Sequence, residues 1–316
     1  MDHKNFRSFQ DAGQAVLQYL YQRFGFNLWM ITRVEAKDWI VLQSEDHGYD
    51  VKPGQVFQWA DSFCSHMVAG NGPKIAPRSD DIPLYATAPI NQQVSIKSYI
   101  GQPLFHEDGS LFGTLCAIDP QTKSEAIIQE VELIELFGNL LSNILQAELR
   151  QNEQIRQCER LEAEALRDGL TGLYNRRAWE QLVNAEEERC KRYGHPTAVF
   201  FIDLNNLKKV NDSLGHNKGD DLIQQAAHVL RDTARSNDIV ARFGGDEFVI
   251  LSVENDEMGA KLLLNRIKEA LAQAEICAAI GVAMRHPTHG LFKAIIDADQ
   301  KMFEHKRQIK SEDQKI

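Results

Sequence analysis

A long helical pattern in the middle of the sequence divides the chain into two parts. The pattern runs from Ser124 to about Asp168 and is much longer than a typical helix of a globular domain. We therefore expect two domains, at residues 1–145 and 168–316, joined by a helical linker at residues 146–167. The apolar residues that repeat at helical spacing in its first half are Ile127, Val131, Ile134, Phe137, Leu141 and Ile144.

The two halves of this helix predict different contacts. The apolar stripe at residues 124–145 is typical of a helix packed on its own domain, and equally of a helix that pairs with a second chain. Residues 146–167 are too polar for a core, and Ile155, Cys158 and Leu161 continue the apolar seam only loosely. We interpret this second half as a parallel two-chain linker, so we expect a homodimer.

The composition excludes several classes of partner. Hydrophobic residues make up 43% and charged residues 25% of the 316 residues, and the formal net charge is −10 at pH 7. This charge argues against binding to nucleic acid or to an anionic membrane, because both require a basic surface. No apolar stretch is long enough to cross a membrane, and the five scattered cysteines form no CxxC pair. We expect a cytoplasmic protein without membrane insertion.

In the first half of the chain, a helical pattern precedes several short strand patterns. Apolar spacing predicts a helix at residues 6–21, and strand-like runs begin at Asn27, Asp38 and Ser95. A turn at Glu107 lies between two apolar runs and predicts a β-hairpin. This order of elements is typical of an α+β sensory domain.

In the second half, strands and helices alternate around a glycine turn. Thr197–Leu204 is typical of a buried strand, and residues 219–233 of an amphipathic helix. Gly244 and Gly245 form the turn of a predicted hairpin. We expect a second α+β domain with a mainly antiparallel central sheet that helices cover on one side.

Two aspartates lie at the ends of predicted strands in this second domain. Asp203 follows the apolar run Ala198–Ile202, and Asp246 lies at the tip of the glycine turn. If the two strands are neighbours, both carboxylates meet at one sheet edge, where they suit Mg²⁺ beneath a nucleotide. A single Asp at a strand end is more often a turn or cap residue. The adjacent Glu247 favours a cation site, because neighbouring carboxylates repel each other.

The glycine turn belongs to the segment RFGGDEF (Arg242–Phe248), and three further blocks accompany it. The segment matches the signature of the GGDEF family. Asp168–Arg177, Phe201–Leu222 and Ala298–Lys306 resemble other motifs of that family, so the resemblance covers roughly residues 160–310. It implies a nucleotide-cyclase or polymerase-palm-like fold and a diguanylate cyclase, which condenses two GTP into cyclic di-GMP and releases two pyrophosphates.

The resemblance also implies a metal centre and a catalytic residue. Asp203 and Asp246, with the Leu204 carbonyl as a further ligand, would hold Mg²⁺ or Mn²⁺. Glu247 would be the catalytic carboxylate, either as a metal ligand or as the base that helps to ionise the attacking 3′-hydroxyl. Lys208 would stabilise charge on the reacting phosphate.

Further residues would bind the substrate GTP. By resemblance, Asn211 and Asp220 would contact the guanine edge, with His216 nearby. Lys306 and Lys310 are four positions apart on a predicted helix and would hold the β- and γ-phosphates. The alternative for this lysine pair is a solvated helix face. Lys310 replaces the usual Arg of the family, and the two side chains differ in their phosphate geometry.

Arg235 and Asp238, in the segment RSND, precede the glycine turn at a characteristic distance. Arg235 lies nine residues before Gly244. The pair resembles the RxxD inhibitory site of the family, which binds cyclic di-GMP and arrests the enzyme. The alternative is a surface Arg and Asp that cap the end of a helix.

The first domain resembles GAF domains more loosely, through Phe63–Asp81 and Tyr99–Asp119. GAF domains bind diverse ligands or only dimerise, so the resemblance does not identify the small molecule or protein that regulates this chain. Cys64 and His66 suggest a chromophore or metal site, against the alternative of a buried Cys and a hydrogen-bonded His.

Two other functions compete with a cyclase. One is a non-catalytic module that binds GTP or cyclic di-GMP, and the other is a GAF-based scaffold with a passive second domain. The complete segment Gly244-Gly245-Asp246-Glu247-Phe248 argues against both.

Overall fold

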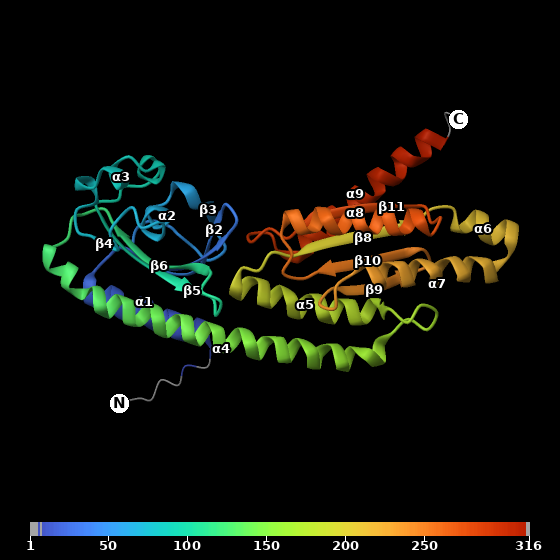
Figure 1. Cartoon of the computed structure of the whole chain (residues 1–316), viewed down its shortest axis with the longest axis horizontal. Coiled ribbons are helices and arrows are strands. Elements are labelled where there is room, and N and C mark those ends of the chain that lie inside the picture. Colours follow the sequence, from blue (N-terminus) through green and yellow to red (C-terminus); the bar gives the residue numbers. More distant parts are fainter. Residues whose placement is uncertain (1–5, 7, 314–316) are drawn as a thin grey trace. The chain divides into compact units, whose positions relative to one another are not determined.

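The computed structural model describes residues 6 and 8–313, which form two compact units (Figure 1). The N-terminal unit runs to Ile155 and takes in Arg192–Gly194, and the remaining described residues form the C-terminal unit. Each unit has its own sheet and its own hydrophobic cores. No helix among the described residues combines the length and apolarity needed to span a membrane.

A six-stranded antiparallel sheet forms the middle of the N-terminal unit, in the order β3-β2-β1-β6-β5-β4. The predicted hairpin around Glu107 is confirmed, because β5 and β6 are paired on either side of it. The strands are β1 (Leu28–Glu35), β2 (Asp38–Asp46), β3 (Val56–Gln58), β4 (Ile75–Ala76), β5 (Ser98–Phe105) and β6 (Leu111–Asp119).

Helices cover both faces of this sheet (Figure 1). On one face, Leu17 and Ile134 are buried with the sheet residue Phe112. On the other face, Phe63 and Tyr85 are buried. The first face carries α1 (Phe9–Phe24) and α4 (Val131–Ala163), and the second carries α2 (Phe63–Val68), α3 (Pro83–Ala86), η1 (Trp59–Asp61), η2 (Ser79–Asp81) and η3 (Pro89–Gln92).

The long helix predicted from the sequence is present as η4 (Glu125–Glu130), α4 and η5 (Glu164–Leu166). Its apolar stripe packs on its own domain: Ile134 and Leu141 are buried in the N-terminal core. A second apolar pair, Leu136 and Leu140, remains 54% and 47% exposed. The stripe therefore stabilises the N-terminal unit, and a different face of α4 is available for other contacts.

The sheet of the C-terminal unit has five strands in the order β11-β8-β10-β9-β7. All neighbouring strands are antiparallel except β7 and β9, which are parallel. The predicted α+β class with a mainly antiparallel sheet is therefore confirmed. The strands are β7 (Tyr174–Asn175), β8 (Ala198–Leu204), β9 (Ile239–Gly244), β10 (Glu247–Ser252) and β11 (Ala278–Met284).

Helices cover both faces of this sheet, so the predicted one-sided cover is wrong. Every residue of β8 is buried, with Phe200 in one core and Phe201 in the other. An uninterrupted apolar run is what a strand needs when both of its faces are covered. One face carries α5 (Arg176–Tyr193) and α9 (Gly290–Asp313), the other carries α7 (His216–Thr233) and α8 (Glu257–Gln273), and α6 (Leu207–Leu214) connects β8 to α7.

The contact between α9 and β11 depends on Gly281. A Cβ at this position would lie 2.0 Å from the Ala298 carbonyl oxygen and 2.2 Å from the Met302 amide nitrogen. We expect Gly281→Ala to lower the free energy of unfolding of the C-terminal unit by about 1–3 kcal/mol, because α9 must move away from the sheet. Gly169→Ala is the control, since an added Cβ there meets nothing within 4 Å. Equal denaturation midpoints for the two variants would contradict this packing.

Candidate functional site

Three carboxylates predicted from the sequence lie at one edge of the C-terminal sheet. Asp203 is opposite Glu247 in the antiparallel register of β8 and β10. The Leu204 amide donates a hydrogen bond of 3.0 Å to the Asp246 carbonyl oxygen, which holds the hairpin turn beside the end of β8. The main chain thus brings Asp203 to Asp246 and Glu247, which lie more than 40 positions later in the sequence.

The glycine turn requires a backbone that other residues rarely adopt. Gly244 ends β9 with φ of 145°, and Gly245 follows with φ of 52°. A Cβ at either residue would meet no heavy atom within 4 Å. The glycines are therefore needed for their conformation, and the open space beside them lets a ligand approach the main chain.

Arg242 fixes this turn from within the unit. Its Nε and Nη2 atoms donate to the Gly245 carbonyl oxygen at 3.1 and 2.8 Å, and Nη1 donates to Asp168 Oδ1 at 3.0 Å. Although burial opposes the charged form, hydrogen bonds from Thr171 and Arg242 lower the pKa of Asp168. Sequence reasoning assigned no role to Arg242 or Asp168, although each is the first residue of a recognised motif.

Negative charge accumulates around Glu247. Burial raises the pKa of this carboxyl, and the charges of Asp203, Asp246 and Asp299 raise it further, while Lys306 opposes them. Lys306, on α9, donates to Asp203 Oδ1 at 2.6 Å. In this structure the predicted phosphate ligand Lys306 therefore neutralises a predicted metal ligand.

The oxygen atoms at this edge suit a hard divalent cation whose coordination a nucleotide completes. Among residues 6 and 8–313, no three Asp, Glu, His or Cys side chains converge closely enough to hold a metal ion alone. Mg²⁺ usually takes one or two carboxylates and completes its shell with water and phosphates. Asp203 and Asp246, with the neighbouring Leu204 main chain, fit that requirement.

The three residues predicted to contact guanine meet where α6 turns into α7. Asn211 lies on α6, and His216 and Asp220 lie on the first turns of α7, where both are exposed. A Cβ at Gly219 would lie 1.9 Å from Asn211 Oδ1, so this glycine lets the amide of Asn211 lie against the start of α7. Gly215, with φ of 86°, forms the bend between the two helices.

The remaining cations are distributed over two helices. Lys208 lies exposed on the first turn of α6. Lys310 belongs to α9 together with Lys306, but its side chain lies outside the described part of the structure. The structure thus places Lys306 at the carboxylates. The role of Lys310 in phosphate binding stays a prediction.

Arg235 and Asp238 form a turn between α7 and β9. Asp238 is buried: its Oδ2 accepts from the Arg235 amide at 2.8 Å, and its Oδ1 accepts from Ser252 Oγ at 3.0 Å and from the Val253 amide at 3.3 Å. The Arg235 side chain is exposed. Asp238 therefore fixes the turn, and Arg235 is available to a ligand.

The candidate GAF site is an apolar cavity of about 50 Å³ in the N-terminal unit. Cys64 lines it, is buried, and its sulfur accepts hydrogen bonds from Tyr99 Oη at 3.3 Å and Thr114 Oγ1 at 3.6 Å. Trp39 and Cys116 also line the cavity, and none of its described lining residues is charged. These contacts match the buried cysteine that was the alternative to a chromophore or metal site.

Comparison with known families gives each unit a counterpart. Residues 165–312 match the family described as diguanylate cyclase, GGDEF domain, and residues 8–145 match the GAF domain family. The chain is 30% identical over 215 residues to the diguanylate cyclase DgcP of Escherichia coli. This match covers 67% of the chain and 61% of DgcP. The chain therefore spans less than two thirds of that relative.

Two further matches cover less of the chain. The cyclic di-GMP phosphodiesterase NbdA of Pseudomonas aeruginosa is 39% identical over 106 residues, which covers 34% of this chain and 14% of NbdA. The solved GGDEF domain of DgcB from Caulobacter crescentus, in complex with c-di-GMP, has a TM-score of 0.44 and 25% identity. It covers 46% of this chain and 91% of that structure.

The crowded carboxylates predict a pH-dependent stability. The pKa of Glu247 is higher in the folded protein than in the unfolded chain, so the folded state binds a proton more tightly at this carboxyl. The free energy of unfolding therefore falls as the pH rises from the unfolded-state pKa of Glu247 through its folded-state pKa. Glu247→Gln should therefore raise Tm at pH 7 and leave it unchanged below about pH 4. Glu269→Gln, at an exposed position of α8, is the matched control. A variant less stable than wild type at pH 7 would contradict the repulsion.

Proposed function

This chain is a GAF domain joined to a GGDEF domain, and on that basis we propose that it is a diguanylate cyclase. The observation that carries the proposal is the intact Gly-Gly-Asp-Glu turn, whose carboxylates meet Asp203 at one sheet edge. DgcP is a diguanylate cyclase by its name. NbdA is a cyclic di-GMP phosphodiesterase by its name, so similarity to relatives does not by itself select a cyclase. The rival function is a domain that only binds nucleotide.

In the proposed reaction, the 3′-hydroxyl of each GTP attacks the α-phosphorus of the other. Each attack forms an O3′–P bond and releases pyrophosphate, so two attacks yield cyclic di-GMP. A Mg²⁺ or Mn²⁺ ion held by Asp203, Asp246 and the Leu204 carbonyl would polarise the reacting phosphate. Lys306 and Lys310 would hold the β- and γ-phosphates, and a cation bound to Asp203 would replace Lys306 in neutralising that carboxylate.

Glu247 is the proposed base. Its pKa is raised by burial and by the neighbouring aspartates, which makes the ionised carboxylate a better proton acceptor for the 3′-hydroxyl. Its position beside Asp246 also allows it to ligate the cation. Lys208, exposed at the start of α6, stabilises the charge that develops on the transferring phosphate.

Guanine recognition is assigned to the bend between α6 and α7. The Asp220 carboxylate accepts hydrogen bonds from guanine N1–H and N2–H, and adenine lacks both donors. Asn211 contacts the same edge, with His216 beside it. A site that pairs such donors rejects a base that cannot supply them.

Removal of the base tests the cyclase assignment. Purified full-length protein with GTP and Mg²⁺ should make cyclic di-GMP, and Glu247→Gln should lower turnover by on the order of a hundredfold or more, while the fold remains intact. Glu269→Gln should retain the wild-type rate. Chromatography of the nucleotide products gives the measurement. GTP binding without product in the wild type would support the rival binding module.

One GGDEF domain binds one GTP, so the reaction needs two domains, and we propose a parallel homodimer. Leu136, Leu140, Asn143 and Ala147 are exposed on α4 at alternating spacings of four and three residues. This is the heptad pattern of two-stranded coiled coils. A second copy of the chain on this face would supply the second GTP.

The dimer predicts a specific cross-link. Cys158 is exposed and lies one position past Gln157, through which the same spacing passes, whereas Cys64, Cys116 and Cys190 are buried. In a parallel, in-register pair, the two copies of Cys158 lie at the same height beside the seam. Mild oxidation should give a covalent dimer in wild type and in Cys277→Ser, but not in Cys158→Ser, on non-reducing gels. A dimer that depends on Cys277 instead would exclude this arrangement.

Two kinds of regulation complete the proposal. Cyclic di-GMP binds at Arg235 and Asp238 and inhibits the enzyme, with Arg235 supplying a guanidinium fork that suits a guanine edge or a phosphate. The GAF domain responds to a small molecule or a protein partner. The enzyme would act in the cytoplasm, where GTP is available and its cysteines stay reduced.

A further inference from the structure

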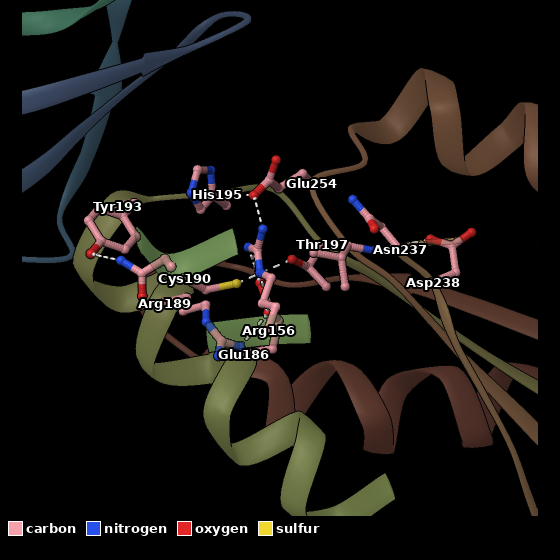
Figure 2. A network of polar contacts seen from close by, with 12 residues as sticks. Arg156, Glu186, Arg189, Cys190, Tyr193, His195, Thr197, Asn237, Asp238 and Glu254 are labelled. Carbon is pink, nitrogen blue, oxygen red and sulfur yellow. Dashed lines mark hydrogen bonds and ion pairs between the residues drawn. The ribbon is translucent and has the colours of Figure 1, made fainter. Parts of the chain in front are cut away.

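The part of α4 that belongs to the C-terminal unit is fixed there by buried ion pairs (Figure 2). Arg156 donates to Glu186 through Nε at 3.2 Å and Nη2 at 2.9 Å, and its Nη1 lies 2.7 Å from Glu254 Oε1. Arg189 pairs with Glu186 at 3.0 Å and also with Glu159 of α4. The Arg156 and Glu186 side chains are only 8% and 2% exposed. Well-bonded buried charges are costly to separate, so this end of α4 is held against α5.

Arg160 lies one helical turn beyond Arg156 and contacts a different element, the RSND turn. Its Nη1 donates to the Ser236 carbonyl oxygen at 2.8 Å and to Asn237 Oδ1 at 3.2 Å. Its Nη2 donates to the Asn237 carbonyl oxygen at 2.6 Å. One guanidinium therefore bonds three acceptors on the two central residues of the turn. The planar fork of Arg suits such a set, whereas a Lys ammonium does not.

The RSND turn is consequently held from two sides. Within the unit, Asp238 bonds the Arg235 amide and two groups of β10 and its end, Ser252 and Val253. From α4, Arg160 bonds the two central residues of the turn, Ser236 and Asn237. The Arg235 side chain remains exposed on a turn whose main chain is fixed. A fixed turn binds a ligand with less loss of conformational freedom than a mobile one.

We propose that Arg160 is a positioning residue for the inhibitory product site. It holds Ser236 and Asn237 in the conformation that presents Arg235 to cyclic di-GMP, so product affinity depends on the docked end of α4. The inference rests on the proposed product inhibition at Arg235. Because coupling between binding events is reciprocal, bound product stabilises the docked segment 156–163 by the same factor by which docking strengthens product binding.

Inhibition kinetics of the full-length protein test the first half of this proposal. Arg160→Ala should raise the inhibition constant for cyclic di-GMP about tenfold, within the usual range of such couplings. Its initial rate and KM for GTP should stay at wild-type values, because Arg160 contacts none of the proposed catalytic residues. Arg160→Lys should restore little of the lost affinity. A merely structural role would move KM or the rate as well, or leave the inhibition constant unchanged.

Arg231→Ala is the matched control. Arg231 is exposed on α7 and forms an ion pair with the neighbouring Asp232, and its loss changes the net charge equally. Its inhibition constant should equal that of wild type. If Arg231→Ala weakens inhibition as much as Arg160→Ala, the effect is one of overall charge and the proposal is wrong.

Hydrogen exchange tests whether bound product stabilises residues 156–163. Saturating cyclic di-GMP should slow amide exchange in these residues of wild type, and the slowing should be absent in Arg160→Ala.

Arg235→Ala distinguishes an error in the product site from an error in the positioning role of Arg160. If Arg235→Ala keeps wild-type sensitivity to product, the product site itself is wrong and this inference is wrong with it. If Arg235→Ala loses sensitivity but Arg160→Ala retains it, only the positioning role is refuted.

Discussion

The antiparallel register of β8 and β10 places Asp203 opposite Glu247. A slip of one residue would turn each side chain of β8 to the other face of the sheet. Because both faces are buried and the run before Asp203 is apolar throughout, the hydrophobic pattern alone does not select between the two registers. At the site, the Leu204–Asp246 main-chain bond holds the end of β8 beside the turn, and Arg242 joins that turn to Asp168.

This register gathers more negative charge than the local cations neutralise. Beside the effect of burial, the charges of Asp203, Asp246 and Asp299 raise the pKa of Glu247, and Lys306 opposes them from α9. Such a cluster repels an anionic nucleotide unless a divalent cation lies between them. A chain with a net charge of −10 would therefore need such a cation at this edge to bind the nucleotide triphosphate that we propose as its substrate.

Local patterns predicted much of this structure. The stripe on α4 and the hairpin at Glu107 follow from periodicity and turn chemistry, and both are present. The two-sided cover of the C-terminal sheet was missed, although the unbroken apolar run of β8 was its signal. The contacts of Arg160 could not be predicted, because its acceptors are carbonyl groups 76 or 77 positions away. A charged residue on a polar helix usually faces solvent. Because every residue has a main-chain carbonyl group, the sequence does not indicate which of them accepts a hydrogen bond.

Different faces of α4 carry different contacts. Before Ile155, one face packs into the N-terminal core and another exposes Leu136 and Leu140. From Arg156 onward, charged side chains bond α5 and the RSND turn within the C-terminal unit. The bonds of Arg156 to α5 are buried, whereas those of Arg160 to the turn are exposed. A displacement of α4 that reaches Arg156 must carry α5 with it or break several ion pairs at once. A change in the position of α4 would therefore act on the C-terminal unit, and on the turn where we propose product binding, through the same few residues.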